Sequence, residues 1–250
     1  LLKSDYTTSL IEIDDKLTKT LELFNPDVVF PALHGPPGED GTIQGFLEIL
    51  GLPYVGSGVR GSALAMDKAI SKQIFRDLDI QTPPGQMIDV MPKNLKGFIK
   101  DIKESIGNKL VVKPINQGSA IGVVIIDDLE TLNSTLKKSL DYGPCLIEKF
   151  IDGKEITVGI LEREKALIAH PVIEITTPDD QWYDFKNRYG KNLSKHSIPA
   201  RLPEHIRTQI QSLAMTAHQG LGLRDLSRAD FIVSESNDIT LLEVNTLPGM

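Results

Sequence analysis

The chain has 250 residues, of which 40% are hydrophobic and 24% are charged, so it can bury a proper core and divide into about two or three compact units. It carries 34 acidic and 27 basic residues, and the net charge of −7 argues against a general nucleic-acid or acidic-membrane surface. The one cysteine, Cys145, excludes an internal disulfide and a multi-cysteine zinc site, which favours a reducing, cytoplasmic environment. No apolar stretch approaches the roughly 18 residues that span a bilayer, and we therefore expect neither secretion nor a membrane anchor.

The first part of the chain alternates helical and strand patterns. Apolar residues at a three-to-four spacing predict an amphipathic helix over 10–24. The run DVVFPAL at 27–33 does not alternate, which predicts a strand covered on both faces, as in a parallel sheet flanked by helices. A helix over 41–50 and a short strand over 52–58 complete a βαβ arrangement, and a further helix is predicted over 62–78. These elements predict a partial Rossmann-like unit.

The adjacent prolines Pro83 and Pro84 force an extended chain and indicate a boundary. Beyond them, helices alternate with hairpin-like strand pairs, which favours an α+β module over continued Rossmann-type winding. The predicted elements are helices over 95–106, 129–140 and 204–220 and strands over 109–114, 123–127, 144–150, 155–162, 166–175, 230–234 and 239–245. A polar stretch at 179–199 is expected to be mobile. The fold class is therefore α/β, with α+β in the second half, and the expected domains are 1–70, 71–152 and 153–250.

A glycine-rich turn, GSAIG at 118–122, exposes backbone N–H groups that an anion can approach closely. A glycine-bearing hairpin without a ligand would show the same pattern. Lys113 lies in the apolar strand VVKP before this turn, and a buried lysine needs an anionic partner, which a phosphate would supply. Lys72 is a second lysine, on a predicted helix, where it is either a solvated surface residue or a further phosphate ligand.

Two predicted strands near the end of the sequence carry polar pairs. Arg228 and Asp230 share one face of a strand at period two, and so do Glu243 and Asn245 on the next strand. Two acids and an amide offer the hard oxygen ligands that Mg²⁺ combines with water and substrate phosphates. Because strands as apolar as LLEV reject unpaired charge, a metal with bound phosphates explains these residues better than surface ion pairs do.

The link between two further strands has its own pattern. Glu148 ends an apolar run, and Glu155 opens the following strand. Such a link can present main-chain donors and acceptors to an adenine edge and an acid to the ribose hydroxyls. An ordinary hinge would explain the same residues.

Eight motifs in this order make the chain resemble the D-alanine–D-alanine ligases of the ATP-grasp superfamily, from about residue 27 to the last residue. The motifs are HGPPGEDGTIQGFLE, LPYVGSGVRGSALAMDKAISK, VVKPINQGSAIGV, LIEKFIDGKEITVGIL, YDFKNRYG, IPARLP, RADF and LLEVNTLPGM. Each motif alone would be weak, but their combination and order are highly specific.

The resemblance implies an ATP-grasp fold that holds ATP between two antiparallel sheets, after a partial Rossmann-like domain. It implies that ATP phosphorylates the carboxylate of one D-alanine and that the amine of a second D-alanine attacks the acyl phosphate, which makes D-alanyl-D-alanine for peptidoglycan and cell wall synthesis. The expected ligands are ATP, D-alanine and two Mg²⁺ or Mn²⁺ ions. Neither nucleic acid nor membrane is expected as a partner, and the resemblance suggests a homodimer.

The resemblance also implies a role for each matching residue. It assigns Lys72, Lys113 and Arg188 to the ATP phosphates, Glu148, Lys149, Phe150 and Ile151 to adenine, and Glu155 to the ribose. It assigns Asp230, Glu243 and Asn245 to the metal ions, and Arg228 and the N–H of Gly249 to the oxyanion of the tetrahedral intermediate. Ser119 and Tyr189 would complete the closed site, His34 would meet the substrate alanine, and Glu39 would support the turn HGPPGEDG at 34–41.

Several positions depart from the family pattern. Arg188 replaces a usual lysine and Ala120 a common second serine, and because a guanidinium is not interchangeable with an ammonium group we expect an altered turnover. Tyr189 is the residue associated with dipeptide rather than D-alanyl-D-lactate formation, which favours an amine as the second substrate. The family's N-terminal glutamate loop and its serine after the PGM motif do not occur in this sequence, so we expect it to bind ATP and Mg²⁺ better than it catalyses ligation.

Two other functions fit part of the pattern. Another ATP-grasp carboxylate–amine ligase would also use Lys113, Asp230, Glu243 and Asn245, although HGPPGEDG and YDFKNRYG favour D-alanine. A non-catalytic ATP-binding module would not need Arg228.

Overall fold

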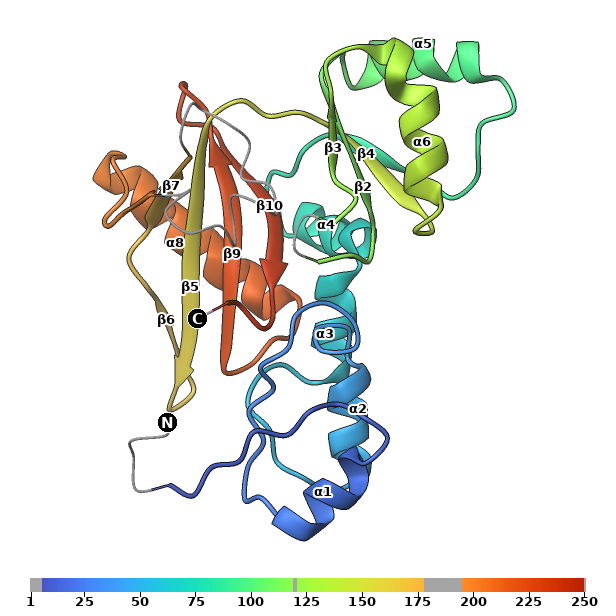
Figure 1. Cartoon of the computed structure of the whole chain (residues 1–250). Coiled ribbons are helices and arrows are strands. Elements are labelled where there is room, and N and C mark those ends of the chain that lie inside the picture. The colour runs from blue at the N-terminus through green and yellow to red at the C-terminus, as the bar shows by residue number, and fades with distance from the viewer. Residues whose placement is uncertain (1–5, 119–120, 178–194, 250) are drawn as a thin grey trace.

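The computed structural model describes residues 6–118, 121–177 and 195–249, which build three hydrophobic cores (Figure 1). A four-stranded sheet with two helices lies at the upper right of Figure 1, a six-stranded sheet with one long helix at the left, and the N-terminal helices below. No helix in these described ranges has the length and apolar character needed to cross a membrane.

The N-terminal part of the chain is mainly helical. It contains α1 (Leu17–Phe24), α2 (Thr42–Ile49), α3 (Val59–Met66) and α4 (Lys68–Asp77). Its small core joins Leu21 of α1 to Ile43 and Leu47 of α2 and to Tyr54. The helix predicted over 41–50 is therefore confirmed as α2.

The four-stranded sheet is antiparallel, with the strand order β1-β4-β2-β3. Its elements are β1 (Gly85–Ile88), α5 (Leu95–Ser105), β2 (Leu110–Pro114), β3 (Val124–Ile126), a 3₁₀ turn (Leu129–Thr131), α6 (Leu132–Leu140) and β4 (Cys145–Lys149). Leu110 and Val112 of β2 and Ile147 of β4 pack in the core with α5 and α6. Because side chains alternate along a strand, Lys113 and Glu148 lie on the opposite face.

The six-stranded sheet is also antiparallel, with the order β10-β9-β5-β7-β8 and with β6 paired to β5. Its elements are β5 (Lys154–Arg163), β6 (Ala166–Ala169), β7 (Ile173–Thr176), β8 (Lys195–Ser197), α8 (Glu204–Gly220), β9 (Leu226–Val233) and β10 (Ile239–Asn245). Val158 of β5 and Phe231 of β9 pack in the core that includes α8. The alternating residues, among them Thr157 and Asp230, lie on the other face. The predicted α+β character of the second half is confirmed.

The helix predicted over 62–78 is wrong as a single element, because the chain breaks at Asp67 between α3 and α4. Asp67 has an extended conformation, and its carboxylate accepts hydrogen bonds from the N–H groups of Ala69 and Ile70, at 2.9 and 3.0 Å. It is therefore the N-cap of α4, and this polar cap outweighs the continuous apolar pattern. Phe75 of α4 is fully buried in the core of the six-stranded sheet.

The helix predicted over 10–24 is too long, since α1 begins only at Leu17 and Leu10 is 92% exposed. An apolar spacing without a surface to cover does not make a helix.

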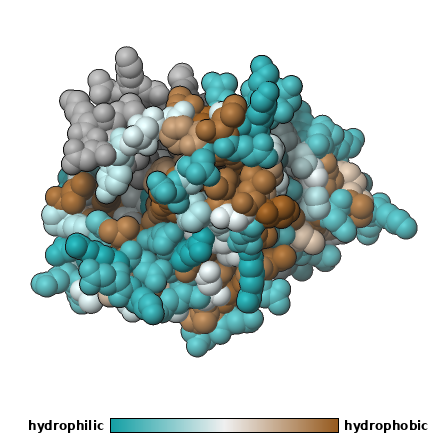
Figure 2. All heavy atoms as spheres, turned by 90° about the horizontal axis from the view of Figure 1, so that it is seen from below, coloured by the Kyte–Doolittle hydropathy of each residue, from teal (hydrophilic) through white to brown (hydrophobic). Residues whose placement is uncertain are grey.

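The strands predicted over 27–33 and 52–58 are also wrong, because one parallel bridge between Val29 and Tyr54 is all that these two segments form in the structure. Proline nitrogens at positions 31 and 53 cannot donate to a ladder, which limits pairing. Val28 and Phe30 are 56% and 40% exposed, so the expected cover on both faces is missing among the described residues. Figure 2, the view from below Figure 1, accordingly shows hydrophobic side chains among hydrophilic ones on this end of the molecule.

The strand predicted over 166–175 is divided into β6 and β7, since the N–H that a ladder needs is missing at Pro171. Strands β1 and β8 were not predicted, because each is only three or four residues long. The stretch expected to be mobile lies mainly outside the described residues, and its end forms β8.

A buried histidine on α8 makes the fold sensitive to acid. His218 is 1% exposed, its Nδ1 lies 2.8 Å from the Ser227 hydroxyl, and its Nε2 has no hydrogen-bond partner among the described residues. Burial lowers the pKa of His218 below its ordinary value of 6.5. The unfolded chain therefore binds more protons than the folded chain below about pH 6.5, and stability falls as the pH drops through this range.

We expect His218→Gln to reduce this acid sensitivity. Between about pH 7.5 and about pH 5.5, the melting temperature of the wild type should fall by roughly 3 °C more than that of the variant. His205→Gln, at an exposed position of the same helix, is the control and should keep the wild-type acid sensitivity. Equal losses in all three proteins would contradict the prediction.

Candidate functional site

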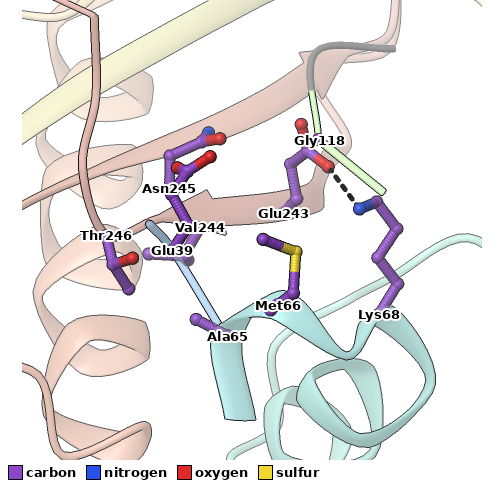
Figure 3. Close-up of a pocket in the computed structure, with 9 residues that line it drawn as sticks. All are labelled: Glu39, Ala65, Met66, Lys68, Gly118, Glu243, Val244, Asn245 and Thr246. Atoms are coloured by element: carbon purple, nitrogen blue, oxygen red, sulfur yellow. Dashed lines mark ion pairs between the residues drawn. The ribbon is translucent and has the colours of Figure 1, made fainter. Parts of the chain in front are cut away.

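Charged residues from both sheets meet where α4 passes between them. A cavity at this point is lined by Glu39, Ala65, Met66, Lys68, Gly118, Glu243, Val244, Asn245 and Thr246. Figure 3 shows Lys68 extending from the start of α4 toward Glu243 of β10, with Asn245 and Thr246 on the far side of the cavity. Segments far apart in the sequence therefore supply opposite charges to one space.

Two of the predicted phosphate ligands share one carboxylate. The Lys72 Nζ lies 2.6 Å from Glu148 Oε1, and the Lys113 Nζ lies 2.7 Å from Glu148 Oε2. The side chains of Lys72 and Glu148 are each 3% exposed, and that of Lys113 is 9% exposed. When both lysines are protonated, two ammonium groups and one carboxylate give this buried cluster an excess of positive charge, which is the electrostatic setting that attracts a phosphate.

The pKa values reflect this unequal count. Burial and the neighbouring Lys113 charge lower the pKa of Lys72 to about 7, although Glu148 opposes them. Burial alone would raise the pKa of Glu148, but the two ammonium groups lower it by more. Burial would likewise lower the pKa of Lys113, but Glu148 and Glu243 raise it. Glu148 and Lys113 therefore stay charged, and Lys72 is the member of the cluster that loses its proton most easily.

A third buried lysine, Lys68, was missed by sequence reasoning. Its Nζ donates to the carbonyl oxygen of Gln117 at 2.7 Å, beside the glycine-rich turn, and lies 3.6 Å from Glu243 Oε2. Burial lowers its pKa, against the charge of Glu243. A signal was present in the sequence, because Lys68 and Lys72 are four residues apart and so lie on one face of a helix.

The predicted metal ligands come together on adjacent strands. In the register of β9 and β10, Glu243 is opposite Asp230 and Asn245 is opposite Arg228, with a bulge between Leu241 and Glu243. The bulge is what brings Glu243 to the face of Asp230.

Hydrogen bonds already surround the Asp230 carboxylate. Its two oxygens accept from Arg228 at 2.9 and 2.8 Å, from the Thr157 hydroxyl at 2.6 Å and from the Asn245 Nδ2 at 3.0 Å. Two carboxylates and an amide oxygen are a donor set that suits Mg²⁺, which takes its remaining ligands from water and phosphates. The residue types present therefore suit a divalent metal, which would have to replace some of the four hydrogen bonds that the Asp230 carboxylate accepts.

The turn HGPPGEDG contributes Glu39 to the lining of the first cavity. The Gly35 N–H donates to Glu39 Oε2 at 2.6 Å, and burial raises the pKa of Glu39 although this bond and His34 lower it. A Cβ on Gly118 would lie 3.4 Å from Glu39 Oε2, and a Cβ on Gly249 would lie 3.8 Å from His34 Cε1. The structure thus brings the turn, the glycine-rich loop and the end of the chain to one place.

A second cavity, of about 590 Å³, lies beside the link between β4 and β5. Phe150, Ile151 and Glu155, which were predicted to meet adenine and ribose, line it together with Ile125 of β3 and Ile232 of β9. Apolar side chains from both sheets therefore contribute to its walls, together with charged residues that include Lys109, Asp127 and Glu174. The volume is within the range of roughly 300 to 1,000 Å³ that is typical of small-molecule sites.

The link itself is held from both sides. The N–H of Lys149 donates to the carbonyl of Pro84 at 2.8 Å, and the N–H of Phe150 donates to that of Lys109 at 3.0 Å. The Lys109 ammonium also lies 3.8 Å from the centre of the Phe150 ring. Lys149 is exposed, and Glu148 points to the lysines instead of lining this second cavity. Ser119, Arg188 and Tyr189 lie outside the described residues.

Two family models together match most of this sequence. Residues 74–250 match the family described as D-ala D-ala ligase C-terminus, and residues 4–57 match D-ala D-ala ligase N-terminus. The chain is 40% identical to a D-alanine–D-alanine ligase of Pelotomaculum thermopropionicum, over 98% of this chain and 78% of the relative. It is 41% identical to that of Geotalea uraniireducens, over 100% of this chain and 78% of the relative.

Solved structures of similar proteins share the fold. The VanG D-Ala:D-Ser ligase of Enterococcus faecalis matches with a TM-score of 0.76 at 32% identity, over 89% of this chain and 64% of that one. The D-alanine–D-alanine ligase of Bacillus anthracis complexed with ATP matches with a TM-score of 0.76 at 29% identity, over 95% of this chain and 74% of that one.

We expect the buried carboxylate to be important for stability. Glu148→Gln leaves two buried ammonium groups without an anion and should lower the free energy of unfolding by about 3 kcal/mol, measured by urea denaturation. Glu104→Gln is the control, because Glu104 is exposed and pairs with Lys100 at 3.8 Å on the surface of α5. Its loss should stay below about 0.5 kcal/mol. Equal losses would show that the cluster does not stabilise the fold.

Proposed function

Because the chain belongs to the D-alanine–D-alanine ligase family, we propose that it uses ATP to join two D-alanine molecules into D-alanyl-D-alanine, a precursor of peptidoglycan. The members of this family are ATP-dependent ligases with the ATP-grasp fold. The observation that carries the proposal is the buried set of lysines and carboxylates contributed by α4 and both sheets, together with one cavity lined by Lys68 and Glu243 and a second lined by strands of both sheets.

We propose that the second cavity, beside the link between β4 and β5, takes the nucleoside of ATP. Ile125 and Ile232 come from the two sheets and would contact the two faces of the base. The main chain of 149–151 would meet its edge, and the Glu155 carboxylate would accept hydrogen bonds from the ribose hydroxyls. The phosphates would then extend toward Lys113 and Lys68, of which Lys68 donates to the carbonyl of Gln117 beside the glycine-rich loop.

Asp230, Glu243 and Asn245 would hold the divalent metal that the family uses. We propose two Mg²⁺ ions in this role, for which Mn²⁺ would be a substitute. A metal bound there would reduce the repulsion between a carboxylate and the γ-phosphate, which is the main difficulty of phosphoryl transfer between anions.

The first cavity, which Lys68 and Glu243 line, would hold the two amino acids. A carboxylate oxygen of the first D-alanine attacks the γ-phosphorus, the bond to the β-bridging oxygen breaks, and ADP leaves. The amine of the second D-alanine then attacks the carbonyl carbon, loses a proton, and the tetrahedral intermediate expels phosphate. Arg228 and the N–H of Gly249 would stabilise the oxyanion, and His34, oriented by the turn that Glu39 supports, would contact the first alanine. Ser119, Tyr189 and the phosphate ligand Arg188, all outside the described residues, would complete the closed site.

The second substrate differs among similar proteins, since the Enterococcus faecalis neighbour is a D-Ala:D-Ser ligase. D-Serine is therefore the second candidate for the acceptor amine, and both candidates form an amide. A cytoplasmic location and a homodimer stay predictions.

An amino-acid-dependent ADP-release assay tests the proposed function. We expect Mg²⁺-dependent ADP release that is fastest with D-alanine, slower with D-serine, and weak with D-lactate or L-alanine. Glu243→Gln should reduce this rate by about 100-fold or more, because it removes a charged metal ligand. Glu235→Gln, at an exposed position of the β9–β10 hairpin, is the matched control and should retain the wild-type rate.

ATP binding without ADP release would favour a non-catalytic ATP-binding module, and ADP release that does not depend on the amino acid would also contradict the ligase. A preference for a different acid and amine would favour another carboxylate–amine ligase. Detection of D-alanyl-D-alanine by mass spectrometry separates these outcomes.

A further inference from the structure

Lys72 and Lys113 reach the Glu148 carboxylate from different elements, α4 and β2. Lys113 lies on β2, and the chain after β2 continues to Gly118, which lines the first cavity. Lys72 lies on α4 with its side chain 3% exposed, against 9% for Lys113, and neither lysine lines either of the two cavities. Apart from its ion pair with Glu148, the Nζ of Lys72 makes no hydrogen bond with any described residue.

The ion pair between Lys72 and Glu148 connects two separate cores. On α4, Phe75 is packed in the core of the six-stranded sheet, and the carbonyl of Gln81, after this helix, accepts from the Leu241 N–H of β10 at 2.9 Å. Glu148 belongs to β4, whose neighbour Ile147 is packed in the core of the four-stranded sheet. The ion pair therefore joins β4, just before the link to β5, to α4, which is packed against the six-stranded sheet.

Charge explains why two lysines are needed. If Lys113 turned from Glu148 to a phosphate and no other cation were present, a carboxylate that is 3% exposed would be left unpaired, which is strongly unfavourable. With Lys72 in place, Glu148 keeps a partner at 2.6 Å. After burial, the Lys113 charge is the second of the two causes that lower the pKa of Lys72, so Lys72 holds its proton more firmly once Lys113 has turned away.

We propose that Lys72 is a positioning residue, which holds the Glu148 carboxylate on α4 so that Lys113 can leave this carboxylate for a phosphate of ATP. The inference rests on the proposed function, because it takes ATP as the ligand. It replaces the direct phosphate contact that the resemblance suggests for Lys72, and it leaves Lys113 and Lys68 as the phosphate-binding lysines.

A double-mutant cycle distinguishes the two roles. ATP affinity is measured by isothermal titration calorimetry for the wild type, Lys72→Met, Glu148→Gln and the double variant. We expect Lys72→Met to weaken ATP binding about 10-fold or more when Glu148 is present. Of the two described counter-ions of Glu148, only Lys113 then remains, and Lys113 is held back from the phosphate. In the Glu148→Gln background the same substitution should change the affinity by less than about twofold, because no carboxylate remains to hold Lys113. An equal loss in both backgrounds would mean that Lys72 contacts the phosphates itself and would overturn the inference.

Kinetics provide a readout that general loss of structure would not reproduce. Lys72→Met should raise the KM for ATP about 10-fold and leave kcat within about threefold, since no reacting group is removed. Lys100→Met is the matched control, because its side chain is 74% exposed on α5, and it should bind ATP like the wild type. If Lys72→Met does not fold, the comparison of Glu148→Gln with the double variant is sufficient, because a direct contact predicts weaker binding by the double variant.

The result also separates this inference from the proposed function. A wild-type chain that does not bind ATP would overturn both. A chain that binds ATP, with Lys72→Met equally harmful in the two backgrounds or harmless in both, would overturn the role of Lys72 alone.

Discussion

The cleft depends on ammonium groups that are buried with too few carboxylates. Lys68, Lys72 and Lys113 are all buried, and their anionic partners are Glu148 and Glu243. Buried charges are stable only when they are paired, so a cluster with surplus cations is not at its electrostatic optimum until an anion enters. A fold that retains such a cluster between two sheets is prepared for a polyphosphate, and this is why the charge count says more about function than the volume of either cavity.

The position of α4 makes this arrangement possible. The cap at Asp67 ends α3 and restarts the helix, which directs Lys68 toward Glu243 of β10 and Lys72 toward Glu148 of β4, while Phe75 stays in the core of the six-stranded sheet. One short helix therefore contributes to both walls of the cleft. Because helix side chains four residues apart lie on one face, the two lysines reach different carboxylates, Glu243 and Glu148, without distorting the backbone.

The two antiparallel sheets contribute different charged residues to the site. Each sheet packs one face against helices and turns the other toward the cleft, so alternate residues of a strand serve stability and binding. The four-stranded sheet contributes Lys113 and Glu148, and the six-stranded sheet contributes Asp230 and Glu243. A nucleotide with a metal is the kind of ligand that matches a cationic wall opposite an anionic one. The shared fold at about 30% identity to ligases with different acceptor amines shows that this division does not by itself select the second substrate.

Local pattern in the sequence determined the strands β2, β4, β5, β9 and β10 and the helices α5 and α8. It also determined that Arg228 lies on one face with Asp230, and Glu243 with Asn245. These features depend only on neighbours along the chain. Local pattern failed at 10–24, 27–33 and 62–78, where apolar spacing found no partner surface or a polar cap interrupted the helix. Only the tertiary structure decided that Lys72 and Lys113 share Glu148 and that Lys68 lies beside Glu243. These partners are far apart in sequence, and burial, which no local pattern reports, is what gives their charges a strong effect.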